Sequence, residues 1–162
     1  MADITLLRSD QIEEAKYVIY STAHELFHDQ DTLEKAVAYY AQTWPLLDID
    51  DFQNSYLANG GTFLVISEGG RIIGTGALRR LEEKIGEIKR LWLLPEYQGQ
   101  GLGYRMMMQL LALARERGYT RLRLQTSPAY QARAFNFYRR LGFHEIPRYA
   151  DDEADVGMEL VL

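Results

Sequence analysis

Three strand-like runs, followed by a glycine-rich turn and an apolar helix, constrain the fold of this chain more than any other feature. The runs are rich in β-branched and apolar residues and occupy residues 62–68, 71–81 and 85–94. Gly69 and Gly70 predict a tight hairpin between the first two runs. The apolar helix that follows the glycines extends to Arg117, with Gly118 as its C-cap. We therefore expect an α/β domain whose front half is antiparallel.

The rest of the chain adds helices before this unit and a strand–helix–strand unit behind it. Capping-box patterns, Asp10 with Glu13 and Asp31 with Glu34, predict two helices, the second ending before Pro45. The remaining predicted elements are a strand at 4–8, a weaker helix at 48–57, a strand at 121–126, a helix at 130–140, and strands at 143–149 and 156–162. Neither a repeat nor a linker interrupts them, so we expect one domain spanning residues 1–162.

Composition excludes several classes of site. The 162 residues include no cysteine, which rules out disulfides, thiolate metal sites and a cysteine nucleophile. The net charge of −5 is unevenly distributed: residues 1–60 carry −8, residues 61–148 carry +8, and residues 149–162 carry −5. A basic centre between acidic ends favours an anionic ligand in the middle and a cationic one near the ends, although a solvated surface explains the pattern equally well.

The glycine-rich turn has the features of an anion-binding site. Glycines allow close approach of the backbone, and the N–H groups at a helix start point outward toward a phosphate. The spacing does not fit a dinucleotide fingerprint, because Tyr104 stands where a third glycine would be required. It does not fit a Walker loop either, which requires Gly-Lys followed by Ser or Thr.

Two blocks resemble the GCN5-related N-acetyltransferase superfamily. Gln98-x-x-Gly101-x-Gly103 resembles that family's pyrophosphate-binding motif, and residues 134–143, AFNFYRRLGF, resemble its Ala-x-x-x-Tyr-x-x-x-Gly-Phe signature. The resemblance covers residues 62–147 well, whereas residues 1–60 match only in general layout. It implies an α/β fold with a mixed, mostly antiparallel central sheet, helices on both faces, and a splay between the fourth and fifth strands.

The resemblance also implies a donor and a binding site. The donor would be acetyl-CoA, its pantetheine arm entering the splay between residues 85–94 and 121–126. Backbone groups near Leu93 and Leu94 would hold that arm. Gln131 stands where the family often has an asparagine that contacts the cofactor, so this contact would come from a longer amide. The backbone amides of the glycine turn would cradle the pyrophosphate; these residues are Gln98, Gly99, Gln100, Gly101, Leu102, Gly103 and Tyr104.

Two side chains match the family's catalytic groups. Tyr138 corresponds to its general acid, which protonates the leaving thiolate, and Glu87 lies where histone-acetylating members carry a general base. A base matters because a side-chain-like amine must lose a proton at neutral pH, at a cost of about 4.6 kcal/mol, whereas an α-amine costs only about 1 kcal/mol. With no cysteine to carry the acyl group, direct transfer in a ternary complex is expected.

Three alternatives remain open. His24-Glu25-Leu26-Phe27-His28 matches the HExxH signature of zinc hydrolases, although no third ligand is evident. A non-catalytic acyl-CoA sensor would keep the binding loop without the chemistry. An interaction module could use the basic centre on nucleic acid, but the basic residues are not interleaved with aromatic ones.

The acceptor is the least determined part of the reaction. Acidic residues before position 60 and after position 150 favour a cationic amine, with Tyr39, Tyr40, Trp44 and Trp92 as possible walls. No leader-like or membrane-length apolar run is present, so we expect a cytoplasmic protein. We expect a monomer or homodimer that binds acetyl-CoA and an amine, without a metal, nucleic acid or membrane partner.

Overall fold

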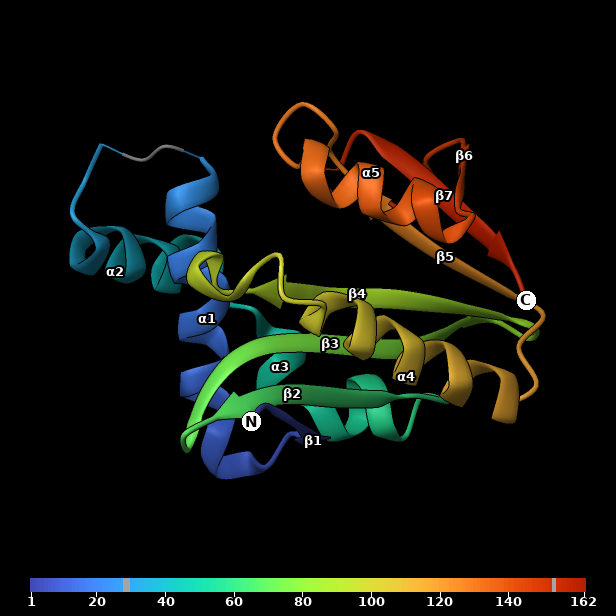
Figure 1. The fold of residues 1–162 in the computed structure, drawn as a ribbon, viewed down its shortest axis with the longest axis horizontal. Coiled ribbons are helices and arrows are strands. Elements are labelled where there is room, and N and C mark those ends of the chain that lie inside the picture. The colour runs from blue at the N-terminus through green and yellow to red at the C-terminus, as the bar shows by residue number, and fades with distance from the viewer. Residues whose placement is uncertain (28–29, 153) are drawn as a thin grey trace.

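The computed structural model describes residues 1–27, 30–152 and 154–162, which form a seven-stranded sheet with helices packed against it (Figure 1). The strand order is β1-β2-β3-β4-β5-β7-β6. All neighbours are antiparallel except β4 and β5, which run parallel. The predicted mixed, mostly antiparallel sheet is confirmed. The strands are β1 (Asp3–Leu6), β2 (Thr62–Glu68), β3 (Arg71–Glu82), β4 (Ile85–Leu93), β5 (Arg121–Thr126), β6 (His144–Ile146) and β7 (Val156–Val161).

Helices cover both faces of the sheet. Figure 1 shows α4 lying across β2, β3 and β4, with α3 behind them. Successive residues of β3 confirm that the two layers lie on opposite faces. A Cβ at Gly76 would meet Met106 of α4. The next residue, Ala77, pairs with Phe63, and Phe63 packs on Tyr56 behind the sheet. The helices are α1 (Ile12–Leu26), α2 (Leu33–Thr43), α3 (Leu47–Asp50), α4 (Leu102–Glu116) and α5 (Ala132–Leu141). None of them, among the described residues, is long and apolar enough to cross a bilayer.

Both capping-box predictions are wrong, although both helices form. A short 3-10 turn, Ser9–Gln11, precedes α1, and Asp10 accepts a hydrogen bond from Arg8 rather than capping the helix. Thr32, not Asp31, caps α2: its Oγ1 accepts from the backbone N–H of Lys35 at 3.3 Å. The weaker helix at 48–57 divides into α3 and a π-helical turn, Gln53–Leu57.

Strand β4 carries a bulge at Arg90. Its partners on β3 change from Thr75↔Trp92 to Ala77↔Lys89, so one extra residue is inserted into β4. Arg90 itself has φ +55°, a left-handed conformation that costs a side-chain-bearing residue about 1–2 kcal/mol. The carbonyl of Arg90 accepts a hydrogen bond from Thr75 Oγ1 at 2.7 Å, which fixes the bulge on β3.

The side chain of Arg90 is fixed by α3. Its Nε and Nη2 donate to Asp48 Oδ2 and Oδ1 at 2.9 and 2.8 Å, and the Tyr56 hydroxyl also donates to Asp48. Burial alone would raise the pKa of Asp48, but the hydrogen bonds and charge of Arg90, helped by Tyr56, hold it below its ordinary value. The ion pair therefore ties the bulge in β4 to the helical layer behind the sheet.

Replacing Asp48 tests this anchor. Asp48→Ala leaves a largely buried guanidinium without its counter-charge, and we expect the free energy of unfolding to fall by about 3 kcal/mol. Because the pKa of folded Asp48 is depressed, its contribution is complete above about pH 4 and is lost as the pH falls further. Urea denaturation of both proteins at neutral and acidic pH measures the difference.

Glu96→Ala is the matched control. Glu96 pairs with Arg71 at 3.9 Å, and both side chains are more than half exposed. Removing such a pair costs at most about 1 kcal/mol. Equal destabilisation by the two variants would show that Asp48 does not anchor the bulge.

Candidate active site

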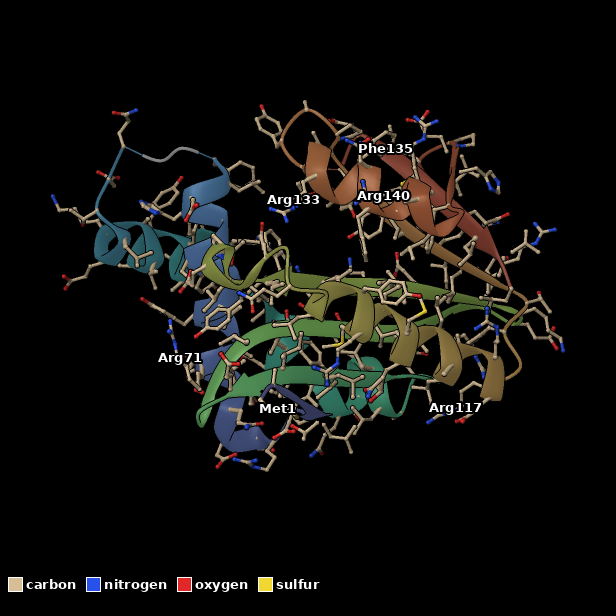
Figure 2. The ribbon with its side chains drawn as sticks, viewed as in Figure 1. Met1, Arg71, Arg117, Arg133, Phe135 and Arg140 are labelled. Atoms are coloured by element: carbon tan, nitrogen blue, oxygen red, sulfur yellow. The ribbon has the colours of Figure 1, made fainter. Side chains whose placement is uncertain are left out.

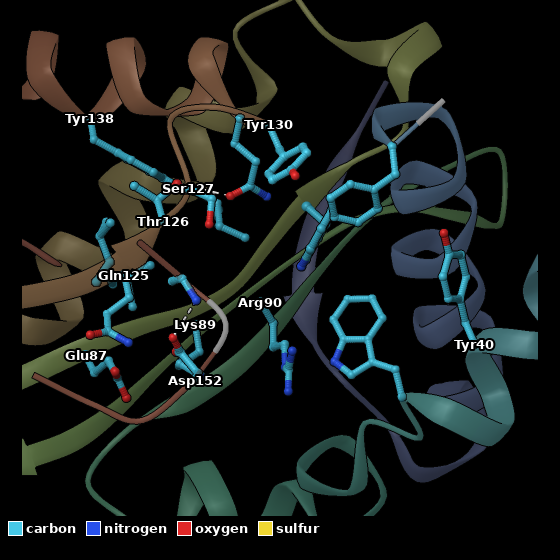
Figure 3. A pocket seen from close by; sticks show the side chains of 18 of the residues that line it. Tyr40, Glu87, Lys89, Arg90, Gln125, Thr126, Ser127, Tyr130, Tyr138 and Asp152 are labelled. Atoms are coloured by element: carbon cyan, nitrogen blue, oxygen red, sulfur yellow. Dashed lines mark hydrogen bonds between the residues drawn. The ribbon is translucent and has the colours of Figure 1, made fainter. Parts of the chain in front are cut away.

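The parallel pair β4–β5 separates after three residue pairs. Ile85, Gly86 and Glu87 pair with β5, the last of them with Arg123, and no later residue of β4 does so. Figure 1 shows the two strands side by side at one end and diverging toward the other. The predicted splay between the fourth and fifth strands is confirmed. A cavity of about 700 Å³ fills the gap (Figure 3). It is lined by residues 88–92 of β4 and by residues 124–127, which comprise the end of β5 and the residue after it.

Glu87 lies at the narrow end of the splay, where it lines the cavity although its exposed fraction is only 2%. Both carboxylate oxygens are hydrogen-bonded. Arg79 Nε donates to Oε1 at 2.9 Å, and the Tyr149 hydroxyl donates to Oε2 at 2.7 Å. These two donors replace the water that a carboxylate loses on burial.

Tyr149 is a site residue that the sequence analysis missed. It follows β6, and its backbone N–H donates to Gln125 Oε1 of β5 at 2.9 Å, while Arg123 lies 5.8 Å from its ring. Burial, followed by the charge of Glu87, raises the pKa of the Tyr149 phenol well above its ordinary range, so the hydroxyl remains a donor. No local pattern around residue 149 indicates this contact, because its partner is 62 residues away.

Tyr138 enters the same cavity from α5. Its ring packs on Phe137 and Phe143, with centroids 5.7 and 5.9 Å away, and only 7% of the residue is exposed. Burial raises its pKa to about 12. At neutral pH the phenol is therefore protonated, and it can donate a proton to an acceptor in the cavity.

Lys89 is a second residue that sequence reasoning missed. It lies two positions after Glu87 on β4, so both side chains point to the same side of the strand, and both line the cavity. Burial lowers the pKa of Lys89, while the charges of Glu87 and Asp152 act in the opposite direction. Asp152 reaches the cavity from the segment between β6 and β7. The cavity therefore has a charged end built from one strand, β4, and one loop (Figure 3).

The glycine-rich turn lies beside the wide end of the splay. Gly99 and Gly101 both have φ +81°, and Gly101 precedes α4 as its N-cap. The first hydrogen bond into α4 runs from Arg105 N to Gly101 O at 3.0 Å, which leaves the earlier amides of the helix without intrahelical partners. A Cβ at Gly101 or Gly103 would meet nothing within 4 Å. The turn thus presents free donors to open space, as an anion site requires.

Two polar side chains border this turn. Gln98 Nε2 donates to Leu93 O at 2.9 Å, and Arg133 Nη1 donates to Gln98 Oε1 at 3.3 Å. Figure 2 shows Arg133 at the start of α5, facing the gap toward α4. Leu94, by contrast, is buried, and its N–H donates to Ile73 O.

Gln131 lies at the junction of β5 and α5, where it is the N-cap residue of α5 and lines the cavity. Thr126 Oγ1 donates to its Oε1 at 3.0 Å. That bond orients the amide and leaves its NH₂ group available for another partner.

The HExxH segment does not form a metal centre in the described part of the chain. His24 Nε2 lies 2.8 Å from the backbone oxygen of Asp31, while His28 lies outside the described residues. Among the residues that are described, no three potential metal ligands come together.

Comparisons with known proteins agree with this geometry. The chain is 29% identical over 102 residues to the uncharacterized N-acetyltransferase YjgM of Escherichia coli, and the match covers 61% of this chain and 60% of YjgM. It is 27% identical to the IAA acetyltransferase of Azospirillum brasilense over the full length of both. The chain spans less than two thirds of the length of the first curated relatives that it matches.

Solved structures show the same fold. The PaiA N-acetyltransferase of Thermoplasma acidophilum, solved in complex with coenzyme A, superimposes with a TM-score of 0.82 at 19% identity, covering 100% of this chain and 99% of that one. The model of the acetyltransferase (GNAT) family matches residues 24–143, which include β4, the glycine turn and Tyr138. On this match the chain belongs to the acetyltransferase (GNAT) family.

Proposed function

We propose that this protein is an N-acetyltransferase that moves the acetyl group of acetyl-CoA to a primary amine by direct transfer in a ternary complex. The observation that carries the proposal is the cavity in the β4–β5 splay, where a protonated phenol and a buried carboxylate face the same space. The amine belongs to a small molecule or peptide and is cationic before it reacts.

The glycine turn binds the diphosphate of coenzyme A in this proposal. The amides that begin α4 lack intrahelical partners, and Gly101 and Gly103 leave open space beside them. Arg133 lies at the same turn and adds a positive charge. The pantetheine arm lies along the unpaired stretch of β4, with the Gln131 amide facing it from α5.

Glu87 takes the proton of the acceptor amine. Because both of its oxygens already accept hydrogen bonds, the proton reaches it through a water molecule in the cavity. Removing that proton from an alkylammonium costs about 4.6 kcal/mol at neutral pH, so a base is worth most for this class of acceptor.

Tyr138 gives its proton to the departing sulfur. A phenol with a pKa of about 12 is a weaker acid than an ordinary thiol near 8.5, a difference of about 5 kcal/mol in bulk water. The same burial also destabilises the thiolate, which raises the pKa of the thiol and narrows this difference. The transfer is therefore less unfavourable while both groups share the cavity than it would be in bulk water. With no cysteine in the chain, the acyl group passes directly from sulfur to nitrogen.

Gly103→Val tests the donor site separately from folding. A side chain at Gly103 meets no neighbour within 4 Å, so we expect the free energy of unfolding to change by less than about 0.7 kcal/mol. The added methyl groups narrow the approach to the α4 amides, and the dissociation constant of coenzyme A, measured by calorimetry, should rise about tenfold or more. Ala112→Val, on an exposed position of the same helix, is the control and should leave that constant unchanged.

Glu87→Gln tests the base. We expect kcat/KM at neutral pH to fall about 100-fold for an alkyl primary amine and much less for a peptide α-amine, because deprotonating an α-amine costs only about 1 kcal/mol. An equal loss with both acceptors would assign Glu87 a purely structural role. Thermal unfolding of the variant checks that the Arg79 and Tyr149 contacts survive.

The reaction itself is tested by thiol release from acetyl-CoA in the presence of a panel of amines, comprising polyamines, amino acids, aminoglycosides, aryl-alkylamines and peptide N-termini. Because the chain has no cysteine, a disulfide reagent reports coenzyme A alone. We expect turnover of at least one amine, and Tyr138→Phe should lower kcat by about 100-fold while the affinity for acetyl-CoA changes little.

The control for this experiment is Tyr17→Phe, which removes the hydroxyl of an exposed tyrosine outside the cavity. Its kcat should equal that of the unmodified protein. Tight binding of acetyl-CoA without turnover of any amine would contradict the proposal and support a non-catalytic acyl-CoA sensor.

A further inference from the structure

One end of the cavity is walled by aromatic side chains from four parts of the chain. They come from the end of α1, from α2 and its C-cap, from β4, and from the segment between β5 and α5. All six line the cavity: Phe27, Tyr39, Tyr40, Trp44, Trp92 and Tyr130. Trp44 lies 6.3 Å from Tyr40 and 6.2 Å from Trp92 between ring centroids, and Phe27 lies 5.6 Å from Tyr130. These contacts form two groups of rings, one around Trp44 and one made of Phe27 and Tyr130, on the same cavity.

Core packing accounts for only part of this wall, because Tyr40, Trp44 and Trp92 are partly buried against the core whereas the other three rings are not. Among the described residues, five aromatic side chains are exposed, and three of them, Phe27, Tyr39 and Tyr130, line this cavity. Tyr39 and Tyr130 are each 60% exposed. Apolar rings left in contact with water around a single cavity are typical of a surface that a ligand covers.

The charges of the cavity show which part of a ligand belongs at this end. Arg90 places a guanidinium 5.9 Å from the Trp44 ring, but that guanidinium is paired with Asp48, so it adds little net charge to the aromatic end. The carboxylates that line the cavity, Glu87 and Asp152, lie at the other end with Lys89 (Figure 3). Among the described residues that line the cavity, none at the aromatic end is a carboxylate, so a second ammonium on the ligand would find no counter-charge there, whereas an uncharged ring needs none.

Several acidic residues that could have attracted a polycation are also engaged elsewhere. Asp48 is bound to Arg90, and Asp50 is 2.7 Å from Lys16. Neither of them lines the cavity. The site therefore complements a ligand with one amine at the charged end and a flat apolar group at the aromatic end.

We infer that the acceptor is an aryl-alkylamine: a primary amine joined by a short linker to an aromatic ring. The ring lies against Trp44, Trp92 and Tyr39, and the amine points toward Glu87 and Asp152. This inference rests on the proposed acetyl transfer, and it assigns the aromatic end as the subsite that selects the acceptor.

Three probe amines separate the ring from the charge. They are 2-phenylethylamine, 2-cyclohexylethylamine, which has the same linker and ammonium with a saturated ring, and spermidine, a polycation without a ring. Because aromatic pairs gain more than their buried area predicts, we expect kcat/KM for 2-phenylethylamine to exceed that for the cyclohexyl amine about threefold to tenfold. It should exceed that for spermidine about tenfold or more.

Binding can be measured without turnover. The chain has two tryptophans, Trp44 and Trp92, and both line the cavity, so tryptophan emission reports its occupancy directly. With coenzyme A present, 2-phenylethylamine should change the emission saturably, at lower concentration than the cyclohexyl amine. This readout remains available even if no amine is acetylated, so it separates a failure of the proposed function from a failure of this inference.

Trp92→Leu removes a ring but keeps an apolar side chain. We expect the preference for the phenyl over the cyclohexyl amine to fall to about one, and Trp92→Phe should restore most of it. Tyr17→Leu, which removes an exposed aromatic side chain outside the cavity, is the control and should keep the full preference. Thermal unfolding verifies that each variant is folded.

Equal or better turnover of spermidine, or a phenyl-to-cyclohexyl preference that survives Trp92→Leu, would overturn the inference while leaving the acetyltransferase proposal intact. If no amine is turned over, unsaturable emission changes with 2-phenylethylamine would overturn it as well. Saturable binding with the stated order of affinities would support it in either case.

Discussion

The site depends on one constraint: Arg90 must stay in a left-handed conformation inside a β-strand. That conformation costs about 1–2 kcal/mol for a residue with a side chain. Thr75 holds its carbonyl, and Asp48 holds its guanidinium through two hydrogen bonds, so the cost is offset by contacts on both sides. A bulge bends the strand that contains it. Here the bulge lies three residues after the last residue of β4 that pairs with β5, within the stretch of β4 that lines the cavity.

The parts of the site with local signals could be predicted from the sequence. Glycines that adopt positive φ before an apolar helix identify the anion turn, and the spacing of Tyr138 within its helix places it on the face toward the core. The partners of the other groups could not be predicted. Arg90 and Asp48 are 42 residues apart, and Glu87 and Tyr149 are 62 apart, so tertiary structure alone brings each pair together. Nothing in the pattern around residue 90 distinguishes a bulge from a regular strand.

The uneven charge along the chain is only a partial guide to the site. In the acidic N-terminal segment, Asp48 and Asp50 form ion pairs with Arg90 and Lys16. In the basic centre, Arg121 and Arg123 both reach Glu159 of the acidic C-terminal segment. All but the Asp50–Lys16 pair connect oppositely charged segments through the fold, and the charges of all of them are largely neutralised before any ligand arrives. Counting charges by segment therefore overstates the field that a ligand meets.

The two proposed proton-transfer groups are both buried, and their different neighbours give them opposite behaviour. Tyr138 is surrounded by Phe137, Phe143 and other apolar groups, so the low-polarity environment favours the neutral phenol, and its pKa rises to about 12. Glu87 is at least as buried, yet a guanidinium and a hydroxyl donate to its two oxygens. One group thus keeps its proton because it lacks polar neighbours, and the other can be buried as a carboxylate because it has them. A cavity that excludes water can hold an acid and a base together only if the fold supplies such unequal surroundings.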